Sequence, residues 1–159
     1  MPEIRVGIGF DVHRLGQGRP LMMGGVEVPS PTGTIGHSDG DPLLHACADA
    51  VLGAAGLGDI GEHFPDTDPA GAGADSARIL AACAEKARAA GWMVVNCDAI
   101  VFLERPRLGA LKPRMAAVLS RLLGGAPASV KAKSAEGLGP VGAGEAAAAQ
   151  AVVLLERRA

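Results

Sequence analysis

The chain has 159 residues, a net charge of −2, 48% hydrophobic and 20% charged residues, which suits one globular domain over residues 1–159 and excludes wholesale disorder. Its 15 basic residues are scattered, and 3 Phe, 1 Trp and no Tyr leave few rings to stack on bases, so no nucleic-acid partner is expected. Without an apolar run of about 18 residues or a basic-then-apolar N-terminus, we expect no membrane partner and a cytoplasmic protein.

The first forty residues predict two strands and a loop. Residues 3–13 mix β-branched residues with glycines, which is typical of a strand, and residues 21–29 indicate a hairpin arm bent at Gly24-Gly25. Residues 30–40 are rich in Pro, Gly, Ser and Thr and therefore predict a loop.

Two helices are predicted in the middle of the chain. Asp41-Pro42 supplies an N-cap and a proline at the first helical position, so a helix should run to about Gly56. Residues 59–73 combine acidic residues, prolines and glycines, and they predict a surface loop able to close over a ligand. Residues 75–90 place apolar side chains on one face and are followed by Gly91, which indicates an amphipathic helix.

The last third of the chain contains one ambiguous segment. Residues 92–104 are dense in Val, Ile and Phe and predict a strand covered on both faces, and residues 112–123 predict a helix. Residues 129–134 indicate a short strand and residues 136–144 a glycine-rich loop. In residues 145–157 the alanines favour a helix, whereas the closing apolar run favours a buried strand.

A carboxylate and two imidazoles form the candidate metal site. Asp11 and His13 are two residues apart on a predicted strand and leave it on the same face, although a solvated strand end would have the same pattern. His45 falls in the first turns of the helix after Asp41. One carboxylate and two imidazoles suit zinc, and three protein ligands leave a position for water or substrate, as in catalytic zinc sites.

Other polar residues allow two interpretations. Asp49 could orient the imidazole of His45 or be a solvated helix carboxylate, and His63 is expected to be exposed in its loop. Residues 130–139, with two lysines and a hydroxyl before glycines, could bind phosphate or form a lysine-bearing edge strand. The cysteines are widely spaced, lack a CxxC pair and are predicted to be buried thiols: Cys47, Cys83 and Cys97.

Common nucleotide and calcium motifs are excluded. Residues 7–12 lack the third glycine of a dinucleotide fingerprint, and no P-loop pattern is present. Asp66 could begin a calcium loop, but the twelfth position is Ala77 rather than glutamate.

Six segments, taken together and in order, resemble the 2-C-methyl-D-erythritol 2,4-cyclodiphosphate synthase family over essentially the whole chain. They are Gly9-Phe10-Asp11-Val12-His13, His37-Ser38-Asp39-Gly40-Asp41 with His45, Leu57-Gly58-Asp59-Ile60-Gly61, Phe64-Pro65-Asp66-Thr67-Asp68-Pro69, Gly73-Ala74-Asp75-Ser76 and Lys131-Ala132-Lys133-Ser134. The resemblance implies a single α+β domain with a mixed four-stranded sheet and helices packed on one face. It further implies a homotrimer whose sheets face the central axis, active sites between subunits, and a strand in residues 145–157.

The same resemblance implies a phosphorus-oxygen lyase of the non-mevalonate isoprenoid pathway. In similar enzymes the 2-phosphate of 4-diphosphocytidyl-2-C-methyl-D-erythritol 2-phosphate attacks the β-phosphorus, closes a ring and expels CMP. By position, Asp11, His13 and His45 hold Zn²⁺, a second divalent cation (Mg²⁺ or Mn²⁺) bridges the phosphates, and His37 and Ser134 steady the transition state.

The resemblance also implies a set of residues that bind substrate. Those expected near the metal and the erythritol are Asp11, Val12, His13, His37, Ser38, Asp59, Ile60, Gly61, Phe64, Pro65, Asp66, Thr67 and Asp68. Those expected at the cytidine end, from the adjoining subunit, are Leu103, Pro106, Arg107, Leu108, Gly109, Ala132, Lys133 and Ser134. The remaining substrate-binding residues that it implies are Ala135, Glu136, Pro140 and Ala143. Pro140 and Ala143 replace an aromatic residue and an arginine common in relatives, which argues against an isoprenoid phosphate in the central cavity.

The chain offers few cations for a polyanionic substrate, so metal ions should supply most of the neutralisation. The ligand triad alone is also compatible with a zinc-dependent phosphoester hydrolase, in which metal-activated water attacks the substrate. A regulatory module that binds nucleotide without turnover is a third interpretation.

Overall fold

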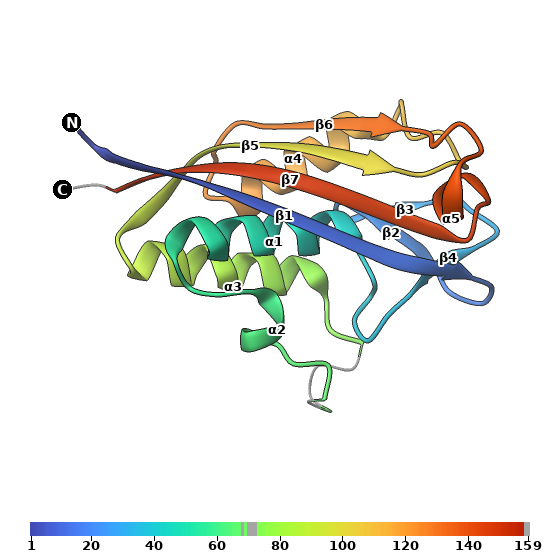
Figure 1. The fold of residues 1–159 in the computed structure, drawn as a ribbon, viewed down its shortest axis with the longest axis horizontal. Coiled ribbons are helices and arrows are strands. Elements are labelled where there is room, and N and C mark those ends of the chain that lie inside the picture. Colours follow the sequence, from blue (N-terminus) through green and yellow to red (C-terminus); the bar gives the residue numbers. More distant parts are fainter. Residues whose placement is uncertain (68, 70–72, 158–159) are drawn as a thin grey trace.

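A computed structural model of the chain describes residues 1–67, 69 and 73–157 (Figure 1). The strands are β1 (Glu3–Gly16), β2 (Leu21–Met23), β3 (Val26–Val28), β4 (Gly33–Ile35), β5 (Trp92–Phe102), β6 (Ala128–Lys133) and β7 (Ala146–Arg157). The helices are α1 (Pro42–Ala55), α2 (Ile60–His63), α3 (Ser76–Ala89), α4 (Lys112–Leu122) and α5 (Gly139–Gly142).

The main sheet is mixed and has five strands in the order β4-β1-β7-β5-β6, while β2 and β3 form a separate hairpin. All neighbouring pairs are antiparallel except β5 and β6, which are parallel. The prediction of four strands was wrong because residues 30–40 are not all loop. β1 continues past His13 to Gly16, and its free backbone edge pairs with Gly33–Ile35 to form β4.

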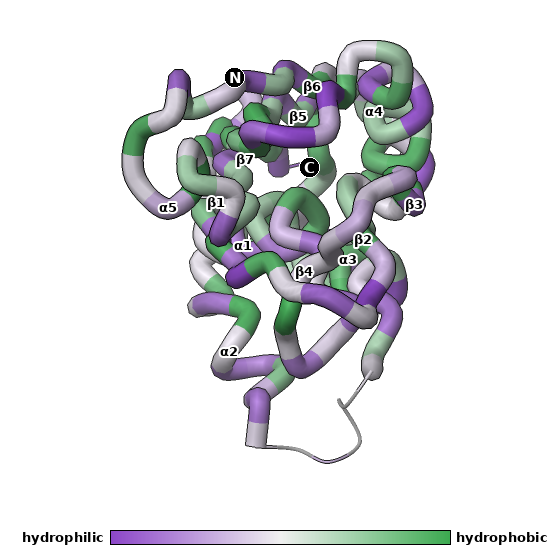
Figure 2. The backbone as a smooth tube through the Cα atoms, turned by 90° about the vertical axis from the view of Figure 1, so that its right-hand side faces the viewer, coloured by the Kyte–Doolittle hydropathy of each residue, from purple (hydrophilic) through white to green (hydrophobic). Residues whose placement is uncertain are grey.

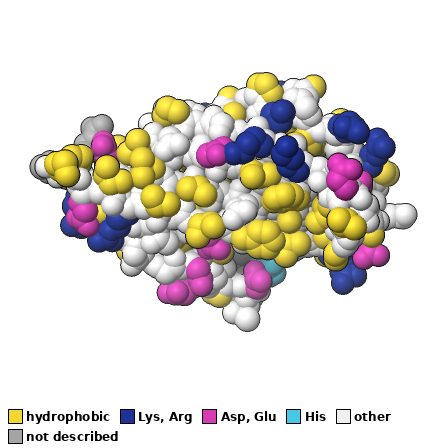
Figure 3. Space-filling view, turned by 45° about the horizontal axis from the view of Figure 1, so that its top comes forward, with side chains coloured by type: hydrophobic (Ala, Val, Ile, Leu, Met, Phe, Trp, Pro, Cys, Tyr) yellow, Lys and Arg dark blue, Asp and Glu magenta, His cyan; other side chains and the backbone are white. Residues whose placement is uncertain are grey.

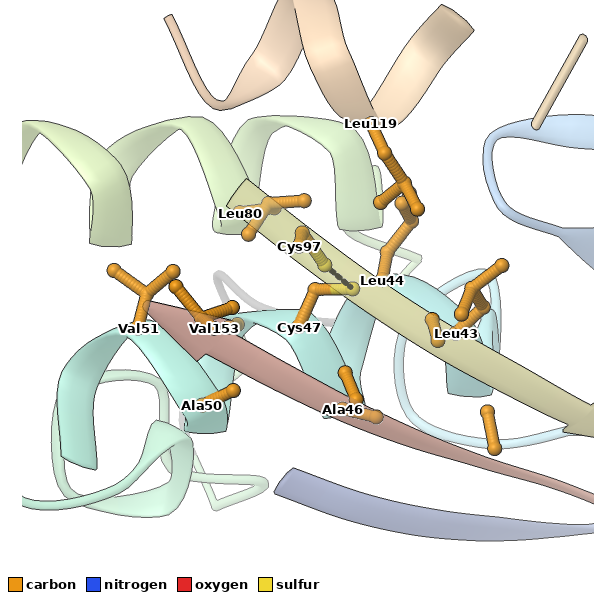
Figure 4. Packing of buried hydrophobic residues seen from close by; sticks show 14 of the residues in the cluster. Leu43, Leu44, Ala46, Cys47, Ala50, Val51, Leu80, Cys97, Leu119 and Val153 are labelled. Atoms are coloured by element: carbon orange, nitrogen blue, oxygen red, sulfur yellow. Dashed lines mark hydrogen bonds between the residues drawn. The ribbon is translucent and has the colours of Figure 1, made fainter. Parts of the chain in front are cut away.

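The three long helices cover one face of the sheet (Figures 1 and 2). A single core joins α1, α3 and α4 to the inner faces of β5 and β7, and Figure 4 shows Leu44, Leu80, Leu119 and Val153 meeting there. All three cysteines are buried and free, as predicted, and the sulfurs of Cys47 and Cys97 lie 3.8 Å apart. No helix in the described part of the chain is long and apolar enough to cross a membrane.

The predicted long elements are confirmed within a few residues, and three short ones were missed. The last segment is the strand β7, whose alanines pack against β1, β5 and α1 instead of forming a helix. In the predicted loop 59–73, Asp59 caps α2 by accepting from the Glu62 N–H. In the predicted loop 136–144, the turn α5 begins with Pro140 near its first position. β4 is the third.

β5 buries only one of its faces within the chain. Cys97, Ala99 and Val101 are buried against the helices, whereas Asp98, Ile100 and Phe102, which alternate with them on the opposite face, are only half-buried. The expectation that this strand is covered on both faces is therefore not met by one chain alone.

Candidate metal centre and its pocket

Two glycines of β1 bring the first helix unusually close to the sheet. A Cβ atom on Gly7 would lie 1.9 Å from the carbonyl oxygen of Ala50, and one on Gly9 would lie 1.9 Å from that of Ala46. Only residues without a side chain permit this contact, so α1 rests directly on the β1 backbone. His45, next to Ala46, is thereby held beside the same strand that carries the other two candidate ligands.

Asp11, His13 and His45 converge as predicted. The Nδ1 atoms of both histidines lie 3.0 Å from Asp11 Oδ2, and the three donor atoms lie within 4.8 Å of one another. Two ligands of a tetrahedral zinc ion, each about 2.0–2.1 Å from it, are separated by about 3.3 Å. The donor set is therefore close to the arrangement that such an ion requires.

The surroundings of His13 also fit a metal ion. His13 Nδ1 is buried, and its 3.0 Å approach to Asp11 Oδ2 does not form a hydrogen bond, so the atom has no hydrogen-bond partner among the described residues. A buried nitrogen in this state is costly unless something else binds it. The opposite side of the ring packs on Gly36, where an added Cβ would lie 2.8 Å from His13 Cδ2. Gly36 thus leaves just enough room for the ring to point Nδ1 toward Asp11.

The charges in the triad support one another. Burial raises the pKa of Asp11, but its interactions with His13 and His45 outweigh burial and lower that pKa to about 2. Burial lowers the pKa of His45, yet the hydrogen bond and charge of Asp11 prevail and raise it. Asp11 is thus an anion at neutral pH, as a metal ligand must be.

A buried aspartate fixes the start of α1, on which His45 lies. Asp41 Oδ1 accepts from the N–H groups of Leu43 and Leu44 at 3.1 Å and of Gly24 at 2.9 Å, and its Oδ2 accepts from Gly25 at 2.7 Å. Burial is the main cause that raises the pKa of Asp41. One carboxylate therefore caps the helix and ties it to the β2–β3 turn.

The loop that carries His37 and Ser38 is braced from two sides. Arg19 donates to the carbonyl oxygens of Gly36 and Ser38, both at 2.8 Å. The Gly73 N–H donates to the His37 carbonyl oxygen at 2.8 Å. The backbone around His37 is therefore held rigidly next to the triad, although Arg19 lies in a turn that the sequence did not single out.

The triad opens into a cavity of about 1220 Å³. It brings together ten of the thirteen residues predicted near metal and erythritol, joined by His45: Asp11, His13, His37, Ser38, Ile60, Gly61, Phe64, Pro65, Asp66 and Thr67. Val12 is 53% exposed on the opposite face of β1, and Asp59 caps α2 instead of lining the cavity. Asp68 lies outside the described residues.

Two residues near the cavity differ from expectation. Asp49 neither orients His45 nor is simply solvated, because its Oδ1 accepts from the Ile60 N–H at 2.7 Å and fixes the start of α2; burial raises its pKa. The expectation of an exposed His63 was wrong, since this half-buried side chain donates from Nε2 to the Leu57 carbonyl oxygen at 2.7 Å.

The residues predicted at the cytidine end lie elsewhere on the chain, and none of them lines the large cavity. Asp11, Ala149, Val101 and Ala132 form one row across β1, β7, β5 and β6. Three strand spacings separate the ends of this row, which is about 14 Å. Ser134, just beyond β6, is consequently remote from the triad of its own chain.

Within that distant group, side chains differ in their availability. Leu103 and Leu108 are buried in the core, so their side chains are not open to a ligand. Pro106 and Arg107 line a second cavity of about 490 Å³ with Arg105 and Gly144. Ala132 and Ala135 are half-buried. The other members are exposed: Gly109, Lys133, Ser134, Glu136, Pro140 and Ala143.

Three residues in or beside the cavity were not assigned a role from the sequence. Arg78 on α3 lines the cavity, whereas Ser76 lies behind its wall and contacts both His45 and Asp39. Ser76 and Asp39 belong to motif segments that carry the family resemblance, so spacing pointed to their importance but not to their partner. The contact between them joins segments 37 residues apart, which no local pattern can indicate.

The fold and the triad define an α+β protein with a candidate metal centre between the sheet and its first helix. Residues 4–156 match the model of the YgbB family, and the chain belongs to that family. It is 52% identical to a 2-C-methyl-D-erythritol 2,4-cyclodiphosphate synthase of Bordetella pertussis (strain Tohama I), over 96% of each chain. It is 54% identical to a protein of that name from Ralstonia pickettii (strain 12J), over 98% of this chain and 94% of the relative.

A solved structure of a 2C-methyl-D-erythritol-2,4-cyclodiphosphate synthase in a CDP-bound form has the same fold, with a TM-score of 0.86 and 42% identity. The match covers 95% of this chain and 99% of that one. These comparisons give no support to the phosphoester hydrolase or to a purely regulatory module.

Proposed function

We propose that this protein converts 4-diphosphocytidyl-2-C-methyl-D-erythritol 2-phosphate to 2-C-methyl-D-erythritol 2,4-cyclodiphosphate and CMP, within isoprenoid biosynthesis. An oxygen of the 2-phosphate forms a bond to the β-phosphorus, the bond from that phosphorus to the CMP oxygen breaks, and CMP leaves with the electron pair. The observation that carries the proposal is the convergence of Asp11, His13 and His45 at the floor of a large cavity, in a chain of this family.

Asp11, His13 and His45 would hold Zn²⁺, because their donor atoms lie within 4.8 Å of one another and the buried His13 Nδ1 has no hydrogen-bond partner among the described residues. When bound, Zn²⁺ and a second divalent cation, Mg²⁺ or Mn²⁺, supply positive charge to the phosphates. The chain's own contribution is then to hold both reacting groups close together, which in favourable intramolecular cases is worth about 7–11 kcal/mol.

The cavity residues divide this work by position. His37 and Ser38, on the loop braced by Arg19, would bind the phosphates next to the metal, with His37 steadying charge in the transition state. Ile60 and Gly61 with Asp59, and the following segment from Phe64 to Thr67, would enclose the erythritol. The size of the cavity leaves room for a folded substrate.

The cytidine end of the site would come from a neighbouring copy of the chain, in a homotrimer. Ser134 is too far along the sheet from the triad of its own chain to act on the same phosphate. The outer face of the sheet also favours assembly, because β1 exposes a continuous row of large apolar side chains: Ile4, Val6, Ile8, Phe10 and Val12. Figure 3 shows hydrophobic side chains gathered over this face beside a group of lysines and arginines.

In that arrangement Ser134 and Lys133 of one subunit would meet the phosphates held by the next. The segment from Leu103 to Gly109, with residues 132–136, would receive cytidine, partly through the backbone of the buried leucines. Pro140 and Ala143, in and after α5, would lie at the edge of the same region.

A product assay tests the reaction. The purified chain with substrate, Zn²⁺ and Mg²⁺ should give cyclic diphosphate and CMP in equal amounts by ³¹P NMR and chromatography, and a chelator should stop it. The His45→Ala variant is the matched control. A linear phosphorylated product in place of the cyclic one would contradict the proposal.

A mixing experiment tests the shared site. His45→Ala and Ser134→Ala should each be nearly inactive, but subunits refolded together at equal amounts should place both intact halves in about one quarter of the sites. Activity should therefore return in the mixture. If the mixture forms mixed oligomers and stays inactive, the site is not shared between subunits.

A further inference from the structure

The outer edge of the His45 ring is held by a serine that the proposed reaction does not use. His45 Nδ1 faces Asp11 Oδ2 at 3.0 Å, while Nε2, on the other side of the ring, lies 2.8 Å from Ser76 Oγ. Ser76 is completely buried at the start of α3, and its hydroxyl also contacts Asp39 Oδ1 in a short hydrogen bond. A chain of polar contacts thus runs from Asp39 through Ser76 to His45.

The protonation of the His45 ring determines which atom donates in each of these hydrogen bonds. A neutral imidazole that offers Nδ1 to a metal carries its proton on Nε2, so Nε2–H donates to Ser76 Oγ. Ser76 then donates its own proton to Asp39, which as a carboxylate only accepts. We propose that Ser76, held by Asp39, is a positioning residue that fixes the ring orientation and tautomer of His45 for metal binding; this rests on the proposed metal site.

The hydroxyl of Ser76 is not needed to cap its helix. Asp75 is the N-cap of α3, and its Oδ1 accepts from the Ala77 N–H at 2.8 Å. The Ser76 N–H is separately bound by Asp39 Oδ2 at 3.2 Å. Removing only the hydroxyl therefore leaves both backbone contacts in place, so the Ser76 side chain acts on His45 and not on the start of the helix.

Asp39 is itself held from several directions, which makes it a firm anchor. Its N–H donates to the Ala74 carbonyl oxygen at 3.0 Å, and its Oδ1 accepts from the Asp41 N–H at 3.3 Å. These bonds link the loop before α1 to the loop before α3. The relay therefore couples the position of a ligand on α1 to the start of α3 across the cavity wall.

Ser38 contacts the same nitrogen of His45, but it is a weaker candidate for fixing the orientation of the ring. Its Oγ is 3.1 Å from His45 Nε2 and accepts from the Gly40 N–H at 3.1 Å. Among the residues that the structure describes, no carboxylate contacts the Ser38 hydroxyl, so Ser38 lacks the anchored acceptor that Asp39 gives to Ser76. Ser76 is therefore the residue to test.

The test measures zinc affinity of the full-length protein by competition with a chromophoric chelator, without substrate. Ser76→Ala should weaken zinc binding about 10–100-fold, as loss of such supporting partners does, while Ser76→Thr, which keeps a hydroxyl, should restore most of it. Ser129→Ala, which removes an exposed hydroxyl on β6, is the matched control and should bind zinc like the unmodified chain.

A second measurement separates positioning from general damage. In the zinc-loaded protein, ¹⁵N NMR of the histidine rings should show His45 protonated on Nε2, and Ser76→Ala should broaden or shift that signal while the His63 signal stays unchanged. Asp39→Asn should also weaken zinc binding, but less than Ser76→Ala does. If Ser76→Ala has a much lower melting temperature than the unmodified chain, the zinc affinity of Asp39→Asn is the deciding measurement.

Zinc affinity in Ser76→Ala and Asp39→Asn equal to that of the unmodified chain would overturn the inference. Because no substrate is present, loss of affinity in these variants would support it even if the unmodified chain failed to form the cyclic product, which would contradict only the proposed reaction.

Discussion

The corner that holds the triad and the far edge of the sheet at β6 are built in opposite ways. At the triad, each candidate ligand is half-buried and contacted from both sides, and the supporting residues come from β1, α1, the loop before α1 and α3. At β6, Lys131, Lys133 and Ser134 are exposed; Lys131 pairs with Asp98, and the Ser134 hydroxyl donates to Glu136 at the surface.

This contrast indicates which half of the proposed site a single chain can complete. The triad needs no second subunit, because helix packing and loop bonds within one chain already orient its donor atoms. The β6 edge offers charges and a hydroxyl but no enclosing wall. We therefore expect metal binding to survive changes that separate subunits, and turnover to depend on them.

The largest effect should follow from separating α1 from the sheet. A Cβ in Gly9→Ala would lie 1.9 Å from the Ala46 carbonyl oxygen, so the helix must shift and carry His45 away. We expect the free energy of unfolding, measured with urea, to fall by about 1–3 kcal/mol, and zinc retention and turnover to be lost. Gly53→Ala on α1, where an added Cβ meets nothing within 4 Å, should not destabilise. Zinc retained by Gly9→Ala would show that this close contact does not set the site.

Separating the subunits should abolish turnover but not metal binding. Ile8 is 64% exposed at the centre of the apolar row on β1, and Ile8→Asp would place a charge in the proposed interface. Light scattering should show a smaller species that still binds zinc with near-normal affinity but makes no cyclic product. A monomeric variant with full turnover would contradict the shared site.

A smaller change should affect the triad alone. In Gly36→Ala the new Cβ would lie 2.8 Å from His13 Cδ2 and 2.9 Å from Nε2, which turns the ring away from Asp11. Zinc affinity should fall about 10–100-fold with little change in melting temperature. Gly109→Ala, at the cytidine end, meets nothing within 4 Å and should leave zinc affinity unchanged. Equal affinities in both variants would mean that the His13 ring tolerates displacement.

The sequence predicted the long elements and the candidate ligands Asp11, His13 and His45 from local patterns, and the structure brings these three side chains together. Alternation placed Asp11 and His13 on one face of β1, and Asp41-Pro42 marked the start of α1. β4 was missed because three residues become a strand only when the end of β1 offers its edge. The secondary structure of residues 145–157 likewise depends on the neighbouring strands. Their alanines favour a helix in isolation, but here they form a strand between β1 and β5.

The supporting residues of the site were beyond local patterns for the same reason. Arg19 braces residues 17 and 19 positions later, and Ser76 reaches a histidine 31 positions earlier. Such contacts depend on how loops meet after folding. The donor atoms of a metal site are therefore easier to predict than the residues that aim them.

The smallest effect should come from the charge on the cavity wall. Among the described residues that line the large cavity, Arg78 is the only lysine or arginine, and it faces a lining that includes Asp11, Asp49, Asp66 and Asp75. Arg78→Gln should raise KM for the polyanionic substrate about tenfold, the equivalent of about 1.4 kcal/mol of binding, with kcat nearly unchanged.

Arg78→Lys should recover most of the loss, and added salt should narrow the difference because Arg78 is exposed. Inhibition by CMP should not change in Arg78→Gln, since CMP is expected at the β6 edge, whereas Lys133→Gln should weaken it. If Arg78→Gln weakened CMP as strongly as substrate, the two ends of the site would not be divided between the triad corner and the β6 edge as the sheet geometry requires.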